Sequence, residues 1–330
     1  MGKNNKSKII FKEIIQMQKT LKLIGKICVI TVASILALVI LFLGGLNIAK
    51  FAIYSEYYSI KTNICKNPGL SDGFVCQGIC AYEEENKFFV SGYMKDGSAS
   101  RIYVTDDKNE SYYVSLSLNG KAVDAHAGGI ATHGDKVYVV DHNCVYVIPL
   151  EDILGAKDGD IVEIKETVKT DNAGSAAYTD GKYLYVGEFH DGVNYITDHP
   201  YNTPDGTYYA IISCYSFDDM SKPEKVYSIR NKVQGMCFTP DGKVVLSTSY
   251  GLADSYYYVY DESKAIDSGL THEGAPVYYL CETEKVVKGP AMAEGLDYYN
   301  GMVITLTESA SDKYIFGKFF FADKIVGLEF

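Results

Sequence analysis

The stretches "CQGICAYEEENKFFVSGY" (residues 76–93) and "VQGMCFTPDGKVVLSTSY" (residues 233–250) align without a gap. They share a Gln-Gly pair, a cysteine two residues after the glycine, and a final tyrosine. Each consists of two short apolar runs separated by turn residues, which is the pattern of a β-hairpin. A chain that repeats such a hairpin 157 residues later contains an internal structural repeat.

Three further copies of the pattern are "HAGGIATHGDKVYVVDH" (126–142), "NAGSAAYTDGKYLYVGEF" (172–189) and "MAEGLDYYNGMVITLTES" (292–309). Their turns contain Asp, Asn and Gly, which tolerate the positive φ that tight hairpin turns require. One glycine near the start of each copy marks the repeat, at spacings of 45 to 61 residues. These glycines are Gly78, Gly129, Gly174, Gly235 and Gly295.

Alternating runs between the copies give each of the first four units four strands. These runs are "SRIYVTDD", "SYYVSLSL", "CVYVIPL", "IVEIKETV", "YYAIISCYSF", "EKVYSI", "SYYYVYDE" and "VYYLCE". The fifth copy continues through "KYIFGKFFFA" to "KIVGLEF" at the end of the chain. Four short antiparallel strands, repeated radially, predict an all-β fold, a β-propeller of four-stranded blades. Five units over residues 65–330 average about 53 residues. Five blades are preferred, and six stay open if a long unit conceals a degenerate blade.

The N-terminal region predicts a membrane helix. Residues 1–26 hold seven lysines and one acid, and residues 27–46 hold no charge, which is about the length that spans a bilayer. Because lysines gather on the cytoplasmic side, we expect a cytoplasmic tail (1–26) and a transmembrane signal-anchor helix (27–49). A cleaved signal peptide stays open, although Asn47 and Lys50 occupy positions where a cleavage site needs small residues.

The rest of the chain then lies outside the membrane. Residues 50–74 are either a linker or a ring-closing strand, since "FAIYSEYYSI" (51–60) alternates and could pair with the last blade. Residues 75–330 form the extracytoplasmic propeller. The chain after residue 49 has 24 basic and 41 acidic residues, a net charge of −17, which argues against nucleic acid and is compatible with cationic ligands.

Seven of the eight cysteines follow the apolar segment, so at least one of them is unpaired within the chain. Their spacing matches no zinc motif. Cys65 and Cys76 could form a disulfide bond that closes a small loop. Several of the other cysteines are expected to be buried free thiols.

At "QGI", "GGIA", "QGM" and "EGL", with hairpins such as "YVVD" and "YVGE", the chain resembles secreted bacterial propellers of the NHL, YncE and SMP-30 (strictosidine-synthase-like) group. More narrowly, it looks like uncharacterised membrane-anchored surface propellers of low-GC Gram-positive bacteria. In SMP-30-like enzymes, acidic and amide side chains at the mouths of the inner strands hold one divalent metal. This resemblance implies a Ca²⁺ or Zn²⁺ site near Gln77, Gln234 and Glu294, with His126 beside it. The other two units depart from this pattern, with Gly128 and Ala173 at the matching positions.

Propeller geometry brings equivalent positions of different blades together at one mouth of the central channel, because the first strand of each blade lines the axis. We therefore expect Gln77, His126, Gln234 and Glu294 to lie close together. A second ring would come from the ends of the second strands, namely Ser91, Asp141, Glu188, Ser249 and Glu308. Such side chains bind divalent cations or transfer protons. In the alternative reading they cap strands and bridge blades, and the glycines only relieve crowding.

The leading hypothesis is a surface-anchored binding module that holds a small molecule, a peptide or an envelope component at the channel mouth. The ligand-binding residues would be Gln77, His126, Asp141, Glu188, Gln234, Glu294 and Glu308. The alternative is a divalent-metal-dependent hydrolase of lactonase or esterase type, with Glu294 and His126 near the metal. The chain has no G-x-S-x-G, P-loop or H-E-x-x-H motif that would indicate a particular reaction.

Overall fold

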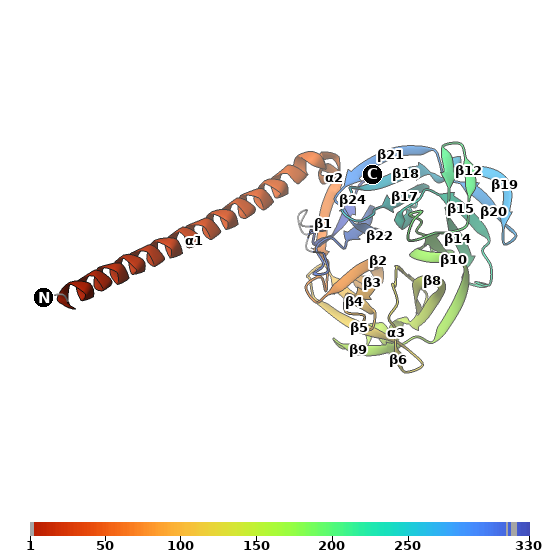
Figure 1. The fold of residues 1–330 in the computed structure, drawn as a ribbon. Coiled ribbons are helices and arrows are strands. Elements are labelled where there is room, and N and C mark those ends of the chain that lie inside the picture. Colours follow the sequence, from red (N-terminus) through yellow and green to blue (C-terminus); the bar gives the residue numbers. More distant parts are fainter. Residues whose placement is uncertain (1–2, 315, 318–321) are drawn as a thin grey trace. The chain divides into compact units, whose positions relative to one another are not determined.

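The computed structural model describes residues 3–314, 316–317 and 322–330. The chain divides into two compact units, a long helix that ends near Ala52 and a ring of β-sheets over Ile53–Phe330 (Figure 1). In the described residues the second unit is almost entirely strands and the loops that join them.

Helix α1 (Lys3–Ile53) is continuous. Within it, Phe11–Ile53 contains an 18-residue window of mean hydropathy 2.9, none of which is buried. A helix of this length and composition can cross a bilayer. The segment predicted as transmembrane, 27–49, lies inside α1, and its exact membrane limits stay a prediction.

The segment predicted to pair as a strand, 51–60, is helical instead. It holds the end of α1 and the short helix α2 (Ser55–Ile60). Tyr54 and Tyr57 lie three residues apart and are both buried, so the aromatic spacing suits a helical face as well as a strand. Tyr57 stacks on Tyr257, with ring centroids 6.0 Å apart.

The strand that closes the ring comes immediately after α2. Strand β1 (Lys61–Lys66) pairs antiparallel with β24 (Lys324–Leu328), so that Thr62 lies opposite Gly327. One sheet therefore contains strands from both ends of the described β unit, in the order β1-β24-β23-β22. This pairing removes two exposed strand edges from the ring.

The fold is a β-propeller. Each blade begins with an inner strand that carries one of the repeat glycines, and the next strands follow outward by antiparallel pairing. The inner strands are β2 (Phe74–Tyr82), β7 (Gly129–His133), the last part of β10 (Glu166–Thr179), β16 (Val233–Phe238) and β22 (Ala293–Tyr299). The number of blades, five or six, stays a prediction.

The outer strands of the first two blades follow their inner strands along the chain. They are β3 (Lys87–Met94), β4 (Arg101–Asp106), β5 (Ser111–Leu118), the short β6 (Lys121–Ala122) and β8 (Lys136–Pro149). β8 pairs with β7 through its first part and with the start of β10 through its second part. The 3-10 turn η1 (Glu83–Glu85) joins β2 to β3, and helix α3 (Leu150–Leu154) follows β8.

The outer strands of the remaining blades are β11 (Tyr183–Glu188), β14 (Ala210–Ser216), β15 (Lys225–Ile229), β17 (Lys243–Thr248), β18 (Ser255–Asp261), β21 (Thr283–Gly289) and β23 (Met302–Thr307). Two insertions account for the longest repeat spacings. One carries the hairpin of β12 (Tyr201–Thr203) and β13 (Gly206–Tyr208). The other carries η2 (Glu262–Lys264), β19 (Ile266–His272) and β20 (Ala275–Tyr279).

Two strands cross to the outer edge of the preceding blade. β9 (Asp160–Glu163) pairs parallel with β5, and β20 pairs parallel with β15. The run "VYYLCE" is predicted as the fourth strand of its own unit. It contributes instead to β20, which pairs with β15 of the preceding blade, and β21 occupies the fourth position of the unit. These additions cover edges that would otherwise expose unpaired backbone groups.

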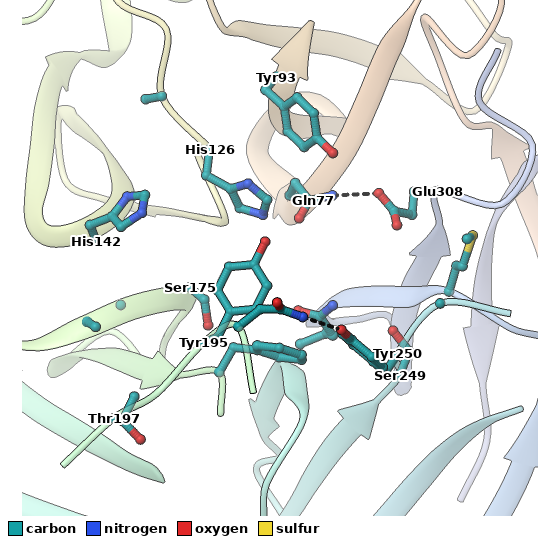
Figure 2. A pocket seen from close by; sticks show the side chains of 18 of the residues that line it. Gln77, Tyr93, His126, His142, Ser175, Tyr195, Thr197, Ser249, Tyr250 and Glu308 are labelled. Atoms are coloured by element: carbon teal, nitrogen blue, oxygen red, sulfur yellow. Dashed lines mark hydrogen bonds between the residues drawn. The ribbon is translucent and has the colours of Figure 1, made fainter. Parts of the chain in front are cut away.

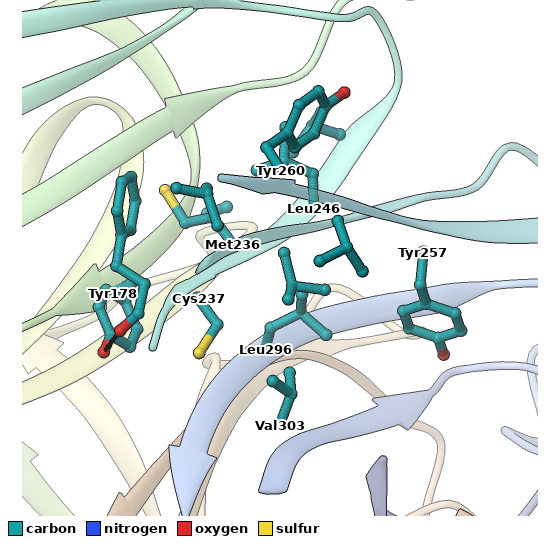
Figure 3. Packing of buried hydrophobic residues seen from close by; sticks show 14 of the residues in the cluster. Tyr178, Met236, Cys237, Leu246, Tyr257, Tyr260, Leu296 and Val303 are labelled. Atoms are coloured by element: carbon teal, nitrogen blue, oxygen red, sulfur yellow. Dashed lines mark hydrogen bonds between the residues drawn. The ribbon is translucent and has the colours of Figure 1, made fainter. Parts of the chain in front are cut away.

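The apolar core lies between neighbouring blades (Figure 3). Tyr185 of β11 stacks on Phe238 of β16, with ring centroids 4.2 Å apart, and Leu296 of β22 belongs to the same cluster. All eight cysteines are free thiols, so the predicted disulfide bond between Cys65 and Cys76 does not form. Both of these cysteines are buried and pack as small apolar groups in another such cluster.

Candidate functional site

At Gly78, Gly129, Gly235 and Gly295 the backbones of adjacent inner strands nearly touch, whereas Gly174 lies against the side chains of Val140 and Val186. A Cβ atom at Gly78 would lie 2.7 Å from the backbone nitrogen of Ile130 and 2.8 Å from the Cα of Gly129. At Gly295 it would lie 2.9 Å from the carbonyl oxygen of Gln77. Any side chain at these sites would force the inner strands apart, so the glycines serve packing at the axis.

Beside this crowded ring the strand ends enclose a cavity of about 790 Å³ (Figure 2). Its wall contains Gln77 on β2, Ser175 on β10 and Gln234 on β16. Loops at the ends of the second strands complete it, with residues 189–197 after β11 and 249–251 after β17 contributing. Gln77 and Gln234, which occupy equivalent positions in two blades, both line this cavity.

Of the predicted site residues, Gln77, His126, Gln234 and Glu308 line the cavity. Ser249, from the predicted second ring, lines it as well. Whether any of them binds a ligand stays a prediction.

Glu308 is a carboxyl group in the cavity wall, close to Gln77. Its Oε2 accepts hydrogen bonds from Gln77 Nε2 at 3.0 Å and from the Tyr314 hydroxyl at 3.2 Å. Burial raises the pKa of Glu308 to about 7, although Tyr314, Lys313 and Gln77 each act to lower it. A carboxyl group with this pKa holds its proton part of the time near neutral pH.

Glu294 lies deeper, in the inner strand β22, and is 2% exposed. Its Oε1 accepts a long hydrogen bond of 3.4 Å from Gln234 Nε2. Burial, together with the nearby Glu308, raises the pKa of Glu294 well above its ordinary value. The glutamines of the two Gln-Gly pairs therefore each donate to one carboxyl group of the blade that closes the ring.

Aromatic side chains form much of the wall. Tyr93 stacks on His126, with ring centroids 5.0 Å apart, and Phe189 stacks on Tyr250 at 6.2 Å. Burial lowers the pKa of His126 to about 4, so its imidazole is neutral at physiological pH. Tyr195 meets Phe189 edge to face at 5.4 Å.

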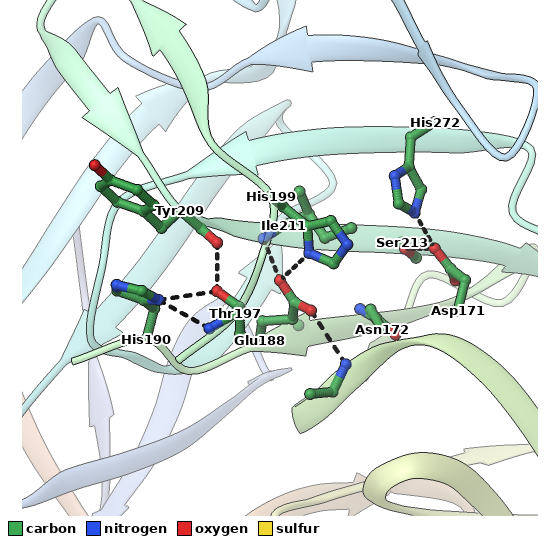
Figure 4. A network of polar contacts seen from close by, with 12 residues as sticks. Asp171, Asn172, Glu188, His190, Thr197, His199, Tyr209, Ile211, Ser213 and His272 are labelled. Atoms are coloured by element: carbon green, nitrogen blue, oxygen red, sulfur yellow. Dashed lines mark hydrogen bonds and ion pairs between the residues drawn. The ribbon is translucent and has the colours of Figure 1, made fainter. Parts of the chain in front are cut away.

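Asp141 and Glu188 have supporting roles in the structure. Asp141 Oδ1 accepts the backbone N–H groups of His126 at 2.8 Å and Ala127 at 3.2 Å, which fixes the loop that carries His126. Glu188 is 1% exposed and accepts from the backbone N–H groups of Ala173 and Ile211, both at 3.1 Å (Figure 4).

Glu188 also contacts His199 Nδ1 at 2.9 Å, and this pair joins a larger polar network. His272 Nε2 lies 2.5 Å from Asp171 Oδ2, and the rings of His199 and His272 meet edge to face with centroids 4.9 Å apart. His199 comes from the insertion that holds β12 and β13, and His272 comes from β19. The network therefore joins the two insertions (Figure 4).

The residues that the resemblance would place at a metal do not fit one. Among the described residues, no group of three His, Cys, Asp or Glu side chains is arranged to hold an ion. Glu294 is bonded to Gln234, whereas His126 is stacked on Tyr93. We therefore derive no step through a Ca²⁺ or Zn²⁺ ion.

Several wall residues were not predicted from the sequence. Tyr195, Ile196 and Thr197 lie in an insertion, where no repeat position identifies them. Tyr93 and Tyr250, however, are the shared final tyrosines of the two Gln-Gly stretches, and both line the cavity. That shared residue was the signal in the sequence that could have found them.

No protein-family model and no curated protein matches the chain. Solved structures do match it in fold. Hydrazine synthase of Kuenenia stuttgartiensis has 14% identity and a TM-score of 0.38, with 71% of this chain and 56% of that chain covered. The chain thus spans little more than half of that protein.

The PQQ-bound aldose sugar dehydrogenase of Streptomyces coelicolor has 14% identity and a TM-score of 0.42, with 74% of this chain and 76% of that chain covered. The Dos1 propeller has 10% identity and a TM-score of 0.33, with 74% and 68% covered. At these identities the likeness concerns the fold alone. Membership of the NHL or SMP-30 group stays a prediction.

Proposed function

We propose that this protein is a membrane-anchored binding module that holds a small organic ligand in the cavity at the mouth of the propeller. The observation that carries the proposal is the cavity itself. It has about 790 Å³ of space, aromatic walls, and residues with amide, hydroxyl and carboxyl groups in its lining. Ligand sites in proteins are typically cavities of roughly 300–1,000 Å³ with apolar walls and a few placed polar groups.

The chemistry of the wall favours a ligand with both a flat apolar face and hydrogen-bonding groups. Tyr93, Tyr195 and Tyr250 offer ring faces and hydroxyls, while Gln77 and Gln234 offer amide groups. Glu308, with a pKa of about 7, either accepts or donates a hydrogen bond depending on its protonation state. Because the chain after residue 49 has a net charge of −17, nucleic acids are poor partners.

We also propose that α1 anchors the protein, with the N-terminus in the cytoplasm and the propeller outside the cell membrane. The lysines before the apolar segment support this orientation. A propeller outside the membrane would bind compounds or envelope components that reach the cell surface.

A fragment screen by saturation-transfer NMR tests the binding proposal with a defined probe set of aromatic amines, monosaccharides and aromatic carboxamides. Ala173 lines the cavity and is half-buried, so Ala173→Trp would fill part of the space. We expect fragments that bind the natural chain to lose their signal with Ala173→Trp and to keep it with Ile161→Ser, a change on the exposed strand β9. Equal signals in all three folded proteins would contradict the proposal.

A further inference from the structure

Exposed apolar side chains gather on two loops at one side of the cavity mouth. Val193 is 75% exposed and Ile196 is 73% exposed, although side chains of this kind are usually buried. We define the apolar rim as five exposed residues of these loops: Val193, Tyr195, Ile196, Tyr250 and Leu252. Contiguous exposed apolar surface of this kind marks interaction sites.

The loop that carries most of the rim is held in one conformation by hydrogen bonds. Asp191 Oδ1 accepts the backbone N–H groups of Val193, Asn194 and Tyr195, each at 2.8 Å. Asn194 Nδ2 donates to the Tyr250 hydroxyl at 3.0 Å, which ties the two loops together. A preorganised surface loses little conformational entropy on binding.

The rim is continuous with the cavity. Tyr195, Ile196 and Tyr250 are exposed and also line the cavity wall, and both tyrosines contact Phe189. A partner that rests on the rim can therefore insert a side chain into the cavity. Anchor side chains in pockets dominate the affinity of many protein interfaces.

The charge around the rim favours a basic partner. Asp191 and Asp198 belong to the loop that carries most of the rim, and Asp124 lies in the cavity wall. Two lysines are also close: Lys232 sits over the Tyr250 ring at 5.2 Å, and Lys313, in the cavity wall, sits over the Tyr93 ring at 4.4 Å. The chain after residue 49 also has a net charge of −17. Anionic lipid surfaces would be repelled by this charge, which makes a lipid surface the poorer occupant.

We propose that the apolar rim docks a polypeptide segment that places an apolar side chain against Val193 and Ile196, with lysine or arginine residues beside it. This goes beyond the proposed function, because Val193 and Leu252 lie outside the cavity wall and a small ligand in the cavity does not need them. A polypeptide suits the rim because it offers apolar and cationic groups on one chain.

Fluorescence anisotropy with three labelled synthetic peptides tests the proposal on the full chain in phosphatidylcholine nanodiscs. The first peptide has an Ile-Tyr-Leu centre flanked by lysines, the second has the same centre flanked by glutamates, and the third has a serine centre flanked by lysines. We expect the first to bind at least about tenfold more tightly than the others, a difference of about 1.4 kcal/mol.

Two variants locate the binding. The double change Val193→Ser with Ile196→Ser should weaken binding of the first peptide about tenfold, whereas Ile161→Ser, which removes a side chain 74% exposed elsewhere, should not. Asp198→Lys should weaken both lysine-flanked peptides and leave the apolar contacts intact.

Equal binding of the three peptides, or no binding of the first, would overturn the proposal. So would unchanged binding in folded rim variants, judged by their melting temperatures. Rim-dependent binding to phosphatidylglycerol vesicles without peptide binding would overturn it in favour of a lipid surface. Val193→Ser alone should weaken binding of the first peptide and leave fragment binding in the cavity unaffected, because Val193 lies outside the cavity wall. This single variant separates the proposal from the proposed function.

Discussion

Gly78 explains why the Gln-Gly pair is repeated. The glycine lets β2 approach β7 closely, and Gln77 beside it donates to Glu308. In the second copy, Gly235 approaches β22, and Gln234 donates to Glu294. The pair thus combines an axial packing position with a hydrogen-bond donor for a buried carboxyl group.

Gly78→Ala should destabilise the propeller, because the new methyl group would meet Ser91 Oγ at 2.6 Å and the Ile130 nitrogen at 2.7 Å. Overpacking of this kind costs about 2 kcal/mol or more. Urea unfolding of the full chain in detergent measures the effect. Gly155→Ala is the matched control, because its φ is −83° and only the Glu151 carbonyl lies near, at 3.1 Å. Equal stability of the two variants would contradict the packing role.

Glu308 should make stability depend on pH. Its pKa in the folded protein, about 7, is above its ordinary value, so between pH 5 and 8 the folded state binds more protons than the unfolded state. Stability should therefore fall as the pH rises through this window, by about 1–3 kcal/mol. Glu308→Gln, which stays neutral and can still accept from Gln77, should flatten that dependence. Urea unfolding at pH 5 and pH 8 measures both proteins, and identical slopes would be the contrary result.

At the scale of elements, closure of the ring depends on β1 and β24. Both edges of β24 are paired, to β1 and to β23, so its backbone groups have no free side. The strand order also shows that β9 and β20 pair with outer strands of neighbouring blades and leave the inner strands unchanged.

Val326→Pro should open this closure. Proline removes a backbone donor in the middle of a strand that is paired on both sides, which costs about 3 kcal/mol or more. Val326→Ala keeps the donor and removes only side-chain contacts, so it separates the two effects. Thermal unfolding followed by circular dichroism should show a much larger loss for proline. Similar losses would mean that packing, and not strand pairing, closes the ring.

The sequence was enough to predict the inner strands, because hairpin turns and repeat glycines are local signals. It was misleading at 51–60, where tyrosines at helical spacing can also be read as an alternating strand. The prediction for "VYYLCE", which contributes to β20, assigned the wrong blade. The partner of β20 is β15, about fifty residues earlier in the chain, and no local pattern indicates that pairing. The cavity residues of the insertions were missed for the same reason, since only the folded ring brings residues 189–197 beside the repeat positions.

For the whole molecule, the orientation across the membrane can be tested with single cysteines. Asp198→Cys, in an exposed loop position of the propeller, should react with a membrane-impermeant thiol reagent in intact cells. Lys12→Cys, before the apolar segment, should react only after lysis. The unchanged protein gives the background of the native thiols, and the reverse labelling pattern would overturn the orientation.

Metal analysis of the purified full chain tests the alternative of a metal-dependent hydrolase. We expect no stoichiometric divalent ion and no shift in melting temperature with added Ca²⁺ or Zn²⁺, because Glu294 and His126 have separate partners. Glu294→Gln is the matched variant. A tightly bound ion that is lost with Glu294→Gln would contradict this expectation and support the hydrolase.

Ligands should bind in the cavity at the mouth of the propeller. Photo-crosslinking of diazirine-bearing members of the fragment set, followed by peptide mass spectrometry, reports the location directly. We expect labels to decrease with Ala173→Trp and to concentrate on the residues that line the cavity, namely 77, 93, 124–126, 142, 173–175, 189, 194–197, 234, 249–251, 292, 308 and 313–314. Labels spread over the outer strands β5, β15 and β21, with no change in the variant, would contradict it.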